Sequence, residues 1–212
     1  MRVLVVGDTH GDMAWVANTV IPLAVRADCS RIMQLGDFGF AFTNDLGRAR
    51  AELATLSALL MDAKVDLTFL PGNHEHYPML RQLARLSTQC ARISPEGHCE
   101  ISRRVFYTGR TSAWRWAGVR CASLGGAVSI DKADRKPGFD WFPEEELSEE
   151  DAQRALRFGM VDVLFSHDGP ANVPFDFLID HEGSEIHRQR VGEVVKHTGR
   201  LDVIETADLL RQ

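Results

Sequence analysis

Four apolar runs in this sequence each end in side chains that can bind a metal ion. The runs cover residues 3–6, 31–35, 67–70 and 161–165. The side chains that follow them are, in chain order, Asp8 and His10, Asp37, Asn73, and His167. In an open α/β sheet, ligands bind beyond the carboxyl ends of the strands. If the four runs are strands of this kind, their polar ends form one shared site.

The first two of these side chains indicate which metals would suit the site. One residue separates Asp8 from His10, and in an extended loop this spacing lets both side chains face the same way. A carboxylate with an imidazole suits manganese, iron, zinc or nickel better than calcium. For this pair alone an alternative stays open, in which Asp8 caps the following helix and His10 lies on the surface.

The remaining donors are stronger evidence for a metal site together than singly. Asp37 has two oxygens that can bridge two cations, but Gly-Asp is also common turn chemistry. Asn73 is a neutral, weak ligand, and asparagine also suits a left-handed turn position. His167 alone is equally well explained as a hydrogen-bonded loop histidine. The prediction of a metal site therefore rests on the joint occurrence of donors at four strand ends.

A pair of cations at such a site would favour phosphate chemistry. Two cations about 3.5–4 Å apart can clamp a phosphoryl oxygen and generate hydroxide between them. His74 directly follows Asn73 and is placed to meet the phosphate or to protonate a leaving oxygen. General acid catalysis of this type typically contributes ~100- to 10,000-fold. We expect Glu75 to orient a neighbouring group or to be solvated, and Asp168 to be structural.

The elements that would position these donors alternate along the first part of the chain. Strands and helices follow each other in a β-α-β-α-β-α order, which favours a parallel sheet with helices outside it. The first helix is predicted at 13–26, with Pro22 kinking or dividing it. A long second helix is predicted to run from a cap at Asn44 or Asp45 to about residue 63, and a third covers 78–86. The long helix should place Leu46, Leu53, Leu56, Leu59 and Leu60 on its inner face.

The rhythm changes after residue 100. Segments 100–108 and 114–124 are predicted to be a pair of antiparallel strands joined by a turn near 109–112. Segment 131–143 is predicted to be an ordered surface loop near the mouth of the site. The remaining expected elements are helices at 148–158 and 184–197, a strand at 161–165 and a short last strand at 201–204.

Length and composition indicate one globular domain over residues 1–212. Hydrophobic residues make up 44% and charged residues 25%, and the formal net charge of -6 leaves no broad basic surface for duplex nucleic acid. The four cysteines form no C-x-x-C pair, which argues against a zinc ribbon and fits a reducing compartment. No apolar run approaches the ~18 residues of a membrane span. We expect a cytoplasmic protein without a membrane partner.

The spaced motifs resemble those of the calcineurin-like metallophosphoesterase superfamily. That family carries D-x-H, G-D, G-N-H-[DE] and a lone histidine, followed by a final G-H-x-H. The first four occur here as Asp8-Thr9-His10, Gly36-Asp37, Gly72-Asn73-His74-Glu75 and His167. The resemblance covers residues 1–170, and the linked set is far more specific than any one member.

The resemblance implies a fold, a cofactor and a set of ligands. The implied fold is α/β, with two packed mixed β-sheets flanked by helices. The implied cofactors are two divalent metal ions, with Mn²⁺, Fe or Zn²⁺ expected. By resemblance, the ligands are Asp8, His10 and Asp37 for the first ion, and Asp37, Asn73 and His167 for the second. His74 would assist at the phosphate.

The chain departs from the family pattern near its C-terminus. No G-H-x-H block occurs, so each metal should lack one imidazole and the second sheet should be truncated, with an exposed edge. Three explanations stay open: a naturally shortened member with a partly retained metal site, which we favour; replacement donors; or a second copy of the chain that covers the edge. The replacement donors considered are His181, His187, His197 and Asp202.

Three functions follow from this pattern. The first is a metal-dependent phosphoesterase acting on a small phosphorylated monoester or diester, with nucleotides among the candidates. The second is a binding or regulatory protein that kept the fold and lost turnover, which the missing histidine block would explain. The third is a nuclease, which would need a basic groove. The only local cluster of basic residues for it is Arg103, Arg104, Arg110, Arg115 and Arg120.

Overall fold

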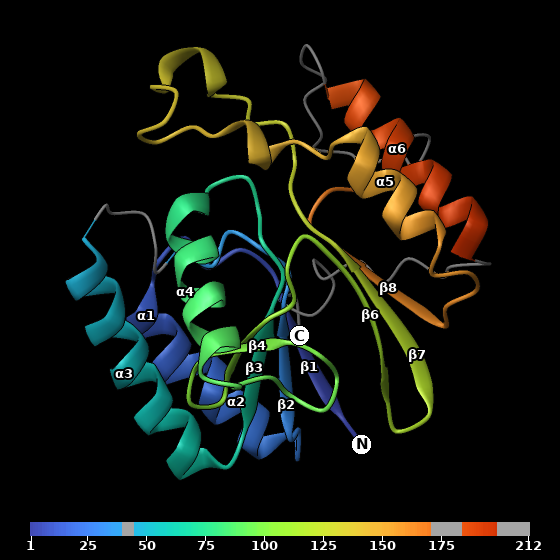
Figure 1. Cartoon of the computed structure of the whole chain (residues 1–212). Helices are drawn as coiled ribbons and strands as arrows, with labels where there is room; N and C mark the ends of the chain where they lie inside the picture. The colour runs from blue at the N-terminus through green and yellow to red at the C-terminus, as the bar shows by residue number, and fades with distance from the viewer. Residues whose placement is uncertain (40–44, 171–183, 199–212) are drawn as a thin grey trace.

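The computed structural model describes residues 1–39, 45–170 and 184–198, and it consists of four layers. Two β-sheets pack against each other, and helices lie on the outer side of each sheet (Figure 1). This arrangement confirms the predicted fold class, an α/β structure of two packed mixed sheets flanked by helices. None of the helices in the described part of the chain has both the length and the apolar character needed to cross a bilayer.

The first sheet has five strands in the order β1-β2-β3-β5-β4. Four of them run parallel, and β4 is antiparallel to β5 at the edge. Their bounds are Val3–Val6 for β1, Arg31–Gln34 for β2, Asp66–Phe69 for β3, Cys99–Ser102 for β4 and Val105–Tyr107 for β5. The parallel strands therefore present their carboxyl ends at one edge of the sheet.

The second sheet has three strands within the described residues, in the order β6-β7-β8. Strands β6 (Thr111–Trp116) and β7 (Val119–Leu124) are antiparallel, and β8 (Val163–Ser166) is parallel to β7. The predicted short last strand, at 201–204, lies outside the described residues.

The predicted pairing of segment 100–108 with segment 114–124 is wrong. Each segment instead contains a hairpin of its own, β4–β5 in the first sheet and β6–β7 in the second. The turns that divide them use left-handed backbone at Arg104 (φ 60°) and at Ala117 (φ 48°) and Gly118 (φ 90°). The chain crosses from one sheet to the other between β5 and β6.

The first helical stretch is divided near its proline, as the sequence predicted. Helix α1 (Met13–Trp15) passes into a π-helical turn, η1 (Val16–Val20), and then into α2 (Ile21–Arg26). The N–H of Ile21 bonds to the carbonyl of Val16, five residues back. Because Pro22 has no N–H to donate, this wider turn carries the helix past it.

Two longer helices complete the outer layer of the first sheet. Helix α3 (Leu46–Ala63) begins at Asp45, whose carboxylate accepts a hydrogen bond from the N–H of Arg48 at 3.0 Å. Helix α4 (Tyr77–Gln89) is longer than predicted. The placement of Leu59 on the inner face of α3 was wrong, because Leu59 is 39% exposed while Leu53, Leu56 and Leu60 are buried.

Alternating side chains of the strands build separate cores on the two faces of each sheet. In β2, Ile32 packs toward the helices, whereas its neighbour Met33 packs between the two sheets with Trp114 and Trp116. In β8, Phe165 faces the same inter-sheet core and stacks on Trp114, with ring centroids 6.0 Å apart. The inter-sheet core fixes the position of β8 relative to the first sheet.

Helices α5 (Glu149–Leu156) and α6 (Ser184–Thr198) cover the second sheet (Figure 1). Helix α5 begins with a capping box, in which Ser148 and Asp151 bond to each other's backbone N–H. Between β7 and α5 runs a long segment with two 3₁₀ turns, η2 (Lys132–Asp134) and η3 (Pro143–Glu145).

Candidate metal centre

The candidate site lies where strands from both sheets end. The loops that follow strands β1, β2 and β3 lie at the same edge of the first sheet, because the strands are parallel and in register. Backbone hydrogen bonds join these loops: the N–H of His10 donates to the carbonyl of Asp37 at 2.8 Å, and the N–H of Gly126 donates to that of Pro71, also at 2.8 Å. The second of these bonds ties the loop after β7 to the loop after β3.

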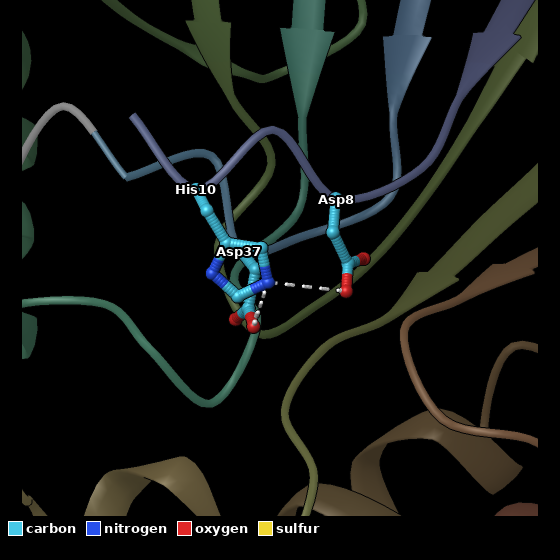
Figure 2. Close-up of side chains that lie close together, drawn as sticks. All are labelled: Asp8, His10 and Asp37. Carbon is cyan, nitrogen blue, oxygen red and sulfur yellow. Dashed lines mark ion pairs between the residues drawn. The ribbon is translucent and has the colours of Figure 1, made fainter. Parts of the chain in front are cut away.

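The first donor group consists of Asp8, His10 and Asp37. The imidazole Nε2 of His10 lies 3.6 Å from Oδ2 of Asp8 and 3.7 Å from Oδ2 of Asp37 (Figure 2). One ligand atom from each residue lies within 4.8 Å of the others. The side chains of Asp8 and His10 are 49% and 54% exposed, whereas Asp37 is buried. This group can hold a cation that solvent and substrate still reach.

The second donor group consists of Asp37, Asn73 and His167. The Nε2 atom of His167 lies 2.8 Å from Oδ1 of Asn73 and 3.5 Å from Oδ1 of Asp37. The side chain of His167 is only 7% exposed. Its other nitrogen, Nδ1, lies 2.7 Å from the carbonyl of Leu35, so this histidine of the second sheet is bonded to the first sheet.

Asp37 connects the two groups through its two carboxylate oxygens. Oδ2 faces His10, while Oδ1 faces His167 and accepts a hydrogen bond from the N–H of His74 at 2.8 Å. A carboxylate whose oxygens face two separate donor groups has the arrangement required of a bridging ligand.

The neutral form of His167 matches a metal ligand. The carbonyl of Leu35 can only accept, so the contact with Nδ1 requires a proton on that nitrogen. Nε2 then carries a lone pair, and it faces Oδ1 of Asn73, which is also an acceptor. Two acceptor atoms 2.8 Å apart favour a cation beside them. The residues present therefore fit a divalent metal ion, and the mixture of imidazole and oxygen donors suits Mn²⁺, Fe or Zn²⁺.

Two glycines let the loops approach this closely. A Cβ atom on Gly72 would lie 2.0 Å from Oδ1 of Asp37, and one on Gly36 would lie 2.5 Å from Nδ1 of His167. Two of the donors also have unusual backbone angles: His10 (φ 43°) and Asp37 (φ 51°) occupy the left-handed region. Strain of this kind in residues other than glycine is concentrated at functional sites.

His74 lies beside both donor groups. Its ring centroid is 5.6 Å from that of His10, and its Nε2 is 3.9 Å from Oδ2 of Asp131. Burial lowers the pKa of His74, with Arg135 acting in the same direction and Asp37 and Asp131 opposing it. Burial also raises the pKa of Asp8, which the neighbouring His167 partly counteracts.

Glu75 is buried behind the site and fixes the loop after β2. Its Oε1 accepts a hydrogen bond from the N–H of Phe38 at 2.8 Å, as expected of a residue that orients a neighbour. Burial raises the pKa of Glu75 to about 8, and the carboxylate of Asp37 adds to this rise.

The loop between β7 and α5 adds side chains that the sequence reasoning did not single out. Segment 131–143 was predicted to lie near the mouth of the site, and Asp131 beside His74 places it there. The further residues are Ser129, Arg135 and Glu145, which are linked to each other and to Asn73. Nothing in their spacing distinguishes them from ordinary loop residues.

The replacement donors considered for the missing histidine block remain without a described position. His181 and Asp202 lie outside the described residues, and the side chains of His187 and His197 on α6 are likewise not described. Within the described part of the chain, Asp8, His10 and Asp37 form the group of histidine and carboxylate ligands that meets metal-binding distances.

Comparison with known proteins agrees with the fold and the donor arrangement. A model of the calcineurin-like phosphoesterase family matches residues 1–205. The chain belongs to this family. A search among curated proteins found no match. Family membership assigns the general class, a metal-dependent phosphoesterase, and the Asp8, His10 and Asp37 group supplies a candidate site for the divalent metal.

Proposed function

We propose that this protein hydrolyses a small phosphorylated monoester or diester, with nucleotides among the candidate substrates, using two divalent cations. The observation that carries the proposal is Asp37, whose two oxygens face the two donor groups. Asp8, His10 and Asp37 would hold the first cation, and Asp37, Asn73 and His167 the second. We propose Mn²⁺, Fe or Zn²⁺ on the basis of the donor types.

The residues around the donors would share the remaining tasks. The chemistry that a bound pair of cations supplies is polarisation of the phosphoryl group and a lower pKa for the attacking water. Asp8 and His10 are about half exposed, so a substrate would approach the cations from their side. The buried Asp37, accepting the N–H of His74, keeps the two donor groups in a fixed relation.

His74 is the proposed catalytic residue. Its lowered pKa favours the neutral imidazole in the free protein. A phosphate anion beside the ring would favour the protonated form, because an opposite charge stabilises the charged state. The ring would therefore take up a proton together with substrate and could return it to the leaving oxygen.

The proposal is tested by hydrolysis of a generic phosphodiester and a generic phosphomonoester in the presence of Mn²⁺. Asp37→Asn keeps the shape of the side chain and removes its charge, so we expect a rate at least ~100-fold lower than that of the wild type. Asp62→Asn, on the exposed face of α3, is the matched control and should retain the full rate. Equal rates for the wild type and Asp37→Asn would show the proposal to be wrong.

A folded wild-type chain that binds no cation and shows no turnover would instead indicate the binding or regulatory protein. The measurement that separates the two functions is the number of Mn²⁺ ions bound per chain, determined on the same preparation as the rates.

A further inference from the structure

Three buried residues of the loop between β7 and α5 form a compact network: Ser129, Arg135 and Glu145. Glu145 is fully buried, Ser129 is almost so, and the side chain of Arg135 is 10% exposed. The two Arg135 nitrogens donate to the two Glu145 oxygens at 2.8 and 3.0 Å. Burial raises the pKa of Glu145 to about 7, and its bonds to Ser129 and Arg135 oppose this rise. In its ionised form the carboxylate, paired with Arg135 in this bidentate way, acts only as an acceptor.

The charge on Glu145 fixes the direction of the hydrogen bond to Ser129. Oγ of Ser129 lies 2.6 Å from Oε2 of Glu145, and against the ionised carboxylate only the serine hydroxyl has a proton to donate. Arg135 donates in turn to Oγ of Ser129 at 2.8 Å. The single proton of the hydroxyl and one of its two lone pairs are thereby used.

One lone pair of Ser129 remains, and it faces the amide of Asn73. The distance from Nδ2 of Asn73 to Oγ of Ser129 is 2.9 Å. Since Ser129 can only accept in this contact, the amide must turn its NH₂ group toward the serine. Its oxygen then faces Nε2 of His167, 2.8 Å away, on the side where the cation is proposed to bind.

We propose that Ser129, oriented by Glu145 and Arg135, is a positioning residue that holds the Asn73 amide with its oxygen toward the second cation. The inference rests on the proposed function. An amide has one end that can bind a cation and one that repels it, and the two ends have nearly the same shape. Without the network, the flipped amide would present N–H groups to the cation and lose its role as a ligand.

The test measures binding of Mn²⁺ alone to the full chain, by titration with calorimetry and with electron paramagnetic resonance. Ser129→Ala should lower the affinity for one of the two Mn²⁺ ions by about 10- to 100-fold and leave the affinity for the other unchanged. This range is the one found when a group that supports a metal ligand is removed. Lys132→Ala is the control from the same loop, because Lys132 is exposed and bonds to Glu146, which is not a member of the network.

A second background separates amide orientation from general support of the fold. A carboxylate at position 73 has two equivalent oxygens and no wrong orientation. In the Asn73→Asp background, Ser129→Ala should therefore change Mn²⁺ affinity by less than about 3-fold, which a double-mutant cycle measures directly. Glu145→Gln should act like Ser129→Ala in the wild-type background, because its amide can donate to Ser129 and release the serine proton toward Asn73.

Each outcome decides between the proposals. Full Mn²⁺ affinity in Ser129→Ala, or an equal loss in both backgrounds, overturns the positioning role while leaving the phosphoesterase proposal intact. A wild type that binds no Mn²⁺, or an Asp37→Asn variant that binds it normally, overturns the metal site itself and the positioning role with it. Circular dichroism of each variant shows whether a loss of binding reflects unfolding.

Discussion

The two donor groups of the candidate site are built in different ways. The first group comes from the ends of β1 and β2, adjacent strands of one sheet, and its Asp8 and His10 are about half exposed. The second group requires β3 from the first sheet and β8 from the other, and its His167 is 7% exposed. The first group therefore depends on local turns, whereas the second depends on how the two sheets and the loop after β7 pack.

This difference has a consequence for how the two groups would respond to change. When the side chain of an exposed donor is removed, water hydrates the groups that it leaves behind. The rest of the structure therefore changes little. A buried donor such as His167 also donates from Nδ1 to the backbone carbonyl of Leu35, and its loss leaves that carbonyl without this hydrogen bond. Variants that disturb one group and spare the other test the comparison.

The largest effect is expected from Gly72→Ala, which disturbs both groups through the shared Asp37. The added methyl group would lie 2.0 Å from Oδ1 and 2.3 Å from the backbone N of Asp37, and neither atom can yield without moving the donors. We expect Mn²⁺ binding at both positions to fall by more than ~100-fold, measured by titration.

Gly7→Ala is the matched control for this variant. A Cβ atom at Gly7 meets no described atom within 4 Å, although the residue directly precedes Asp8. The Gly7→Ala variant should bind Mn²⁺ as the wild type does. Normal binding by Gly72→Ala would mean that Asp37 does not hold the two groups together.

A pair of histidine variants compares the groups directly. His10→Ala should remove one Mn²⁺ and change the free energy of unfolding of the metal-free chain by less than about 0.5 kcal/mol, because the ring is half exposed. His167→Ala should remove the other Mn²⁺ and also destabilise the metal-free chain by about 1–3 kcal/mol, because it removes the hydrogen bond to the partly buried carbonyl of Leu35. Urea unfolding with a chelator present measures both, and equal destabilisation would contradict the comparison.

The same contrast explains what the sequence could and could not predict. The donors Asp8, His10, Asp37, Asn73 and His167 were recognisable because each follows a short apolar strand, and parallel strands end at one edge. The contact between Asn73 and Ser129 joins residues 56 positions apart, and the contact between Ser129 and Glu145 crosses an irregular loop. No periodicity links such positions, so the network became visible only in three dimensions.

The elements of the fold likewise divide into those that the sequence predicts and those that it does not. The start of α3 at Asp45 and its end at Ala63 were predictable, because a cap and a hydrophobic face are local signals. The β4–β5 hairpin was missed because Arg104 takes a left-handed conformation without any glycine, asparagine or proline to mark the turn. Leu59 was misplaced because the spacing of leucines did not show how far the helix face is covered.

The inter-sheet core, on which the second group depends, should be sensitive to acid through His98. This ring is buried edge-on against Trp114, and its Nε2 bonds to no described residue. Burial lowers the pKa of His98 to about 4, against an opposing effect of Glu96. The unfolded chain then binds more protons than the folded chain between pH 6.5 and 4, so stability is lost as pH falls through this window.

The expected size of this effect is about 2 kcal/mol between pH 7.5 and pH 5. His98→Phe keeps the edge-on ring and removes the titratable group. The unfolding free energy of the metal-free variant should therefore fall less between pH 7.5 and pH 5 than that of the wild type, by the amount that His98 contributes. Urea unfolding at the two pH values measures the difference. Identical pH dependence in the wild type and the variant would mean that another group controls acid sensitivity.

The smallest effect is expected at the surface of the same loop that carries the network. Arg81 on α4 pairs with Glu144 in an exposed ion pair, one residue away from the buried Glu145. Exposed pairs of this type contribute about 0.2–1 kcal/mol, so Arg81→Ala should lower the unfolding free energy by no more than that and leave binding of both Mn²⁺ ions unchanged. A loss of the second Mn²⁺ in Arg81→Ala would show that the loop is held from the surface. If Arg81→Ala binds both Mn²⁺ ions normally while Ser129→Ala binds one of them more weakly, the buried residues are what position the loop.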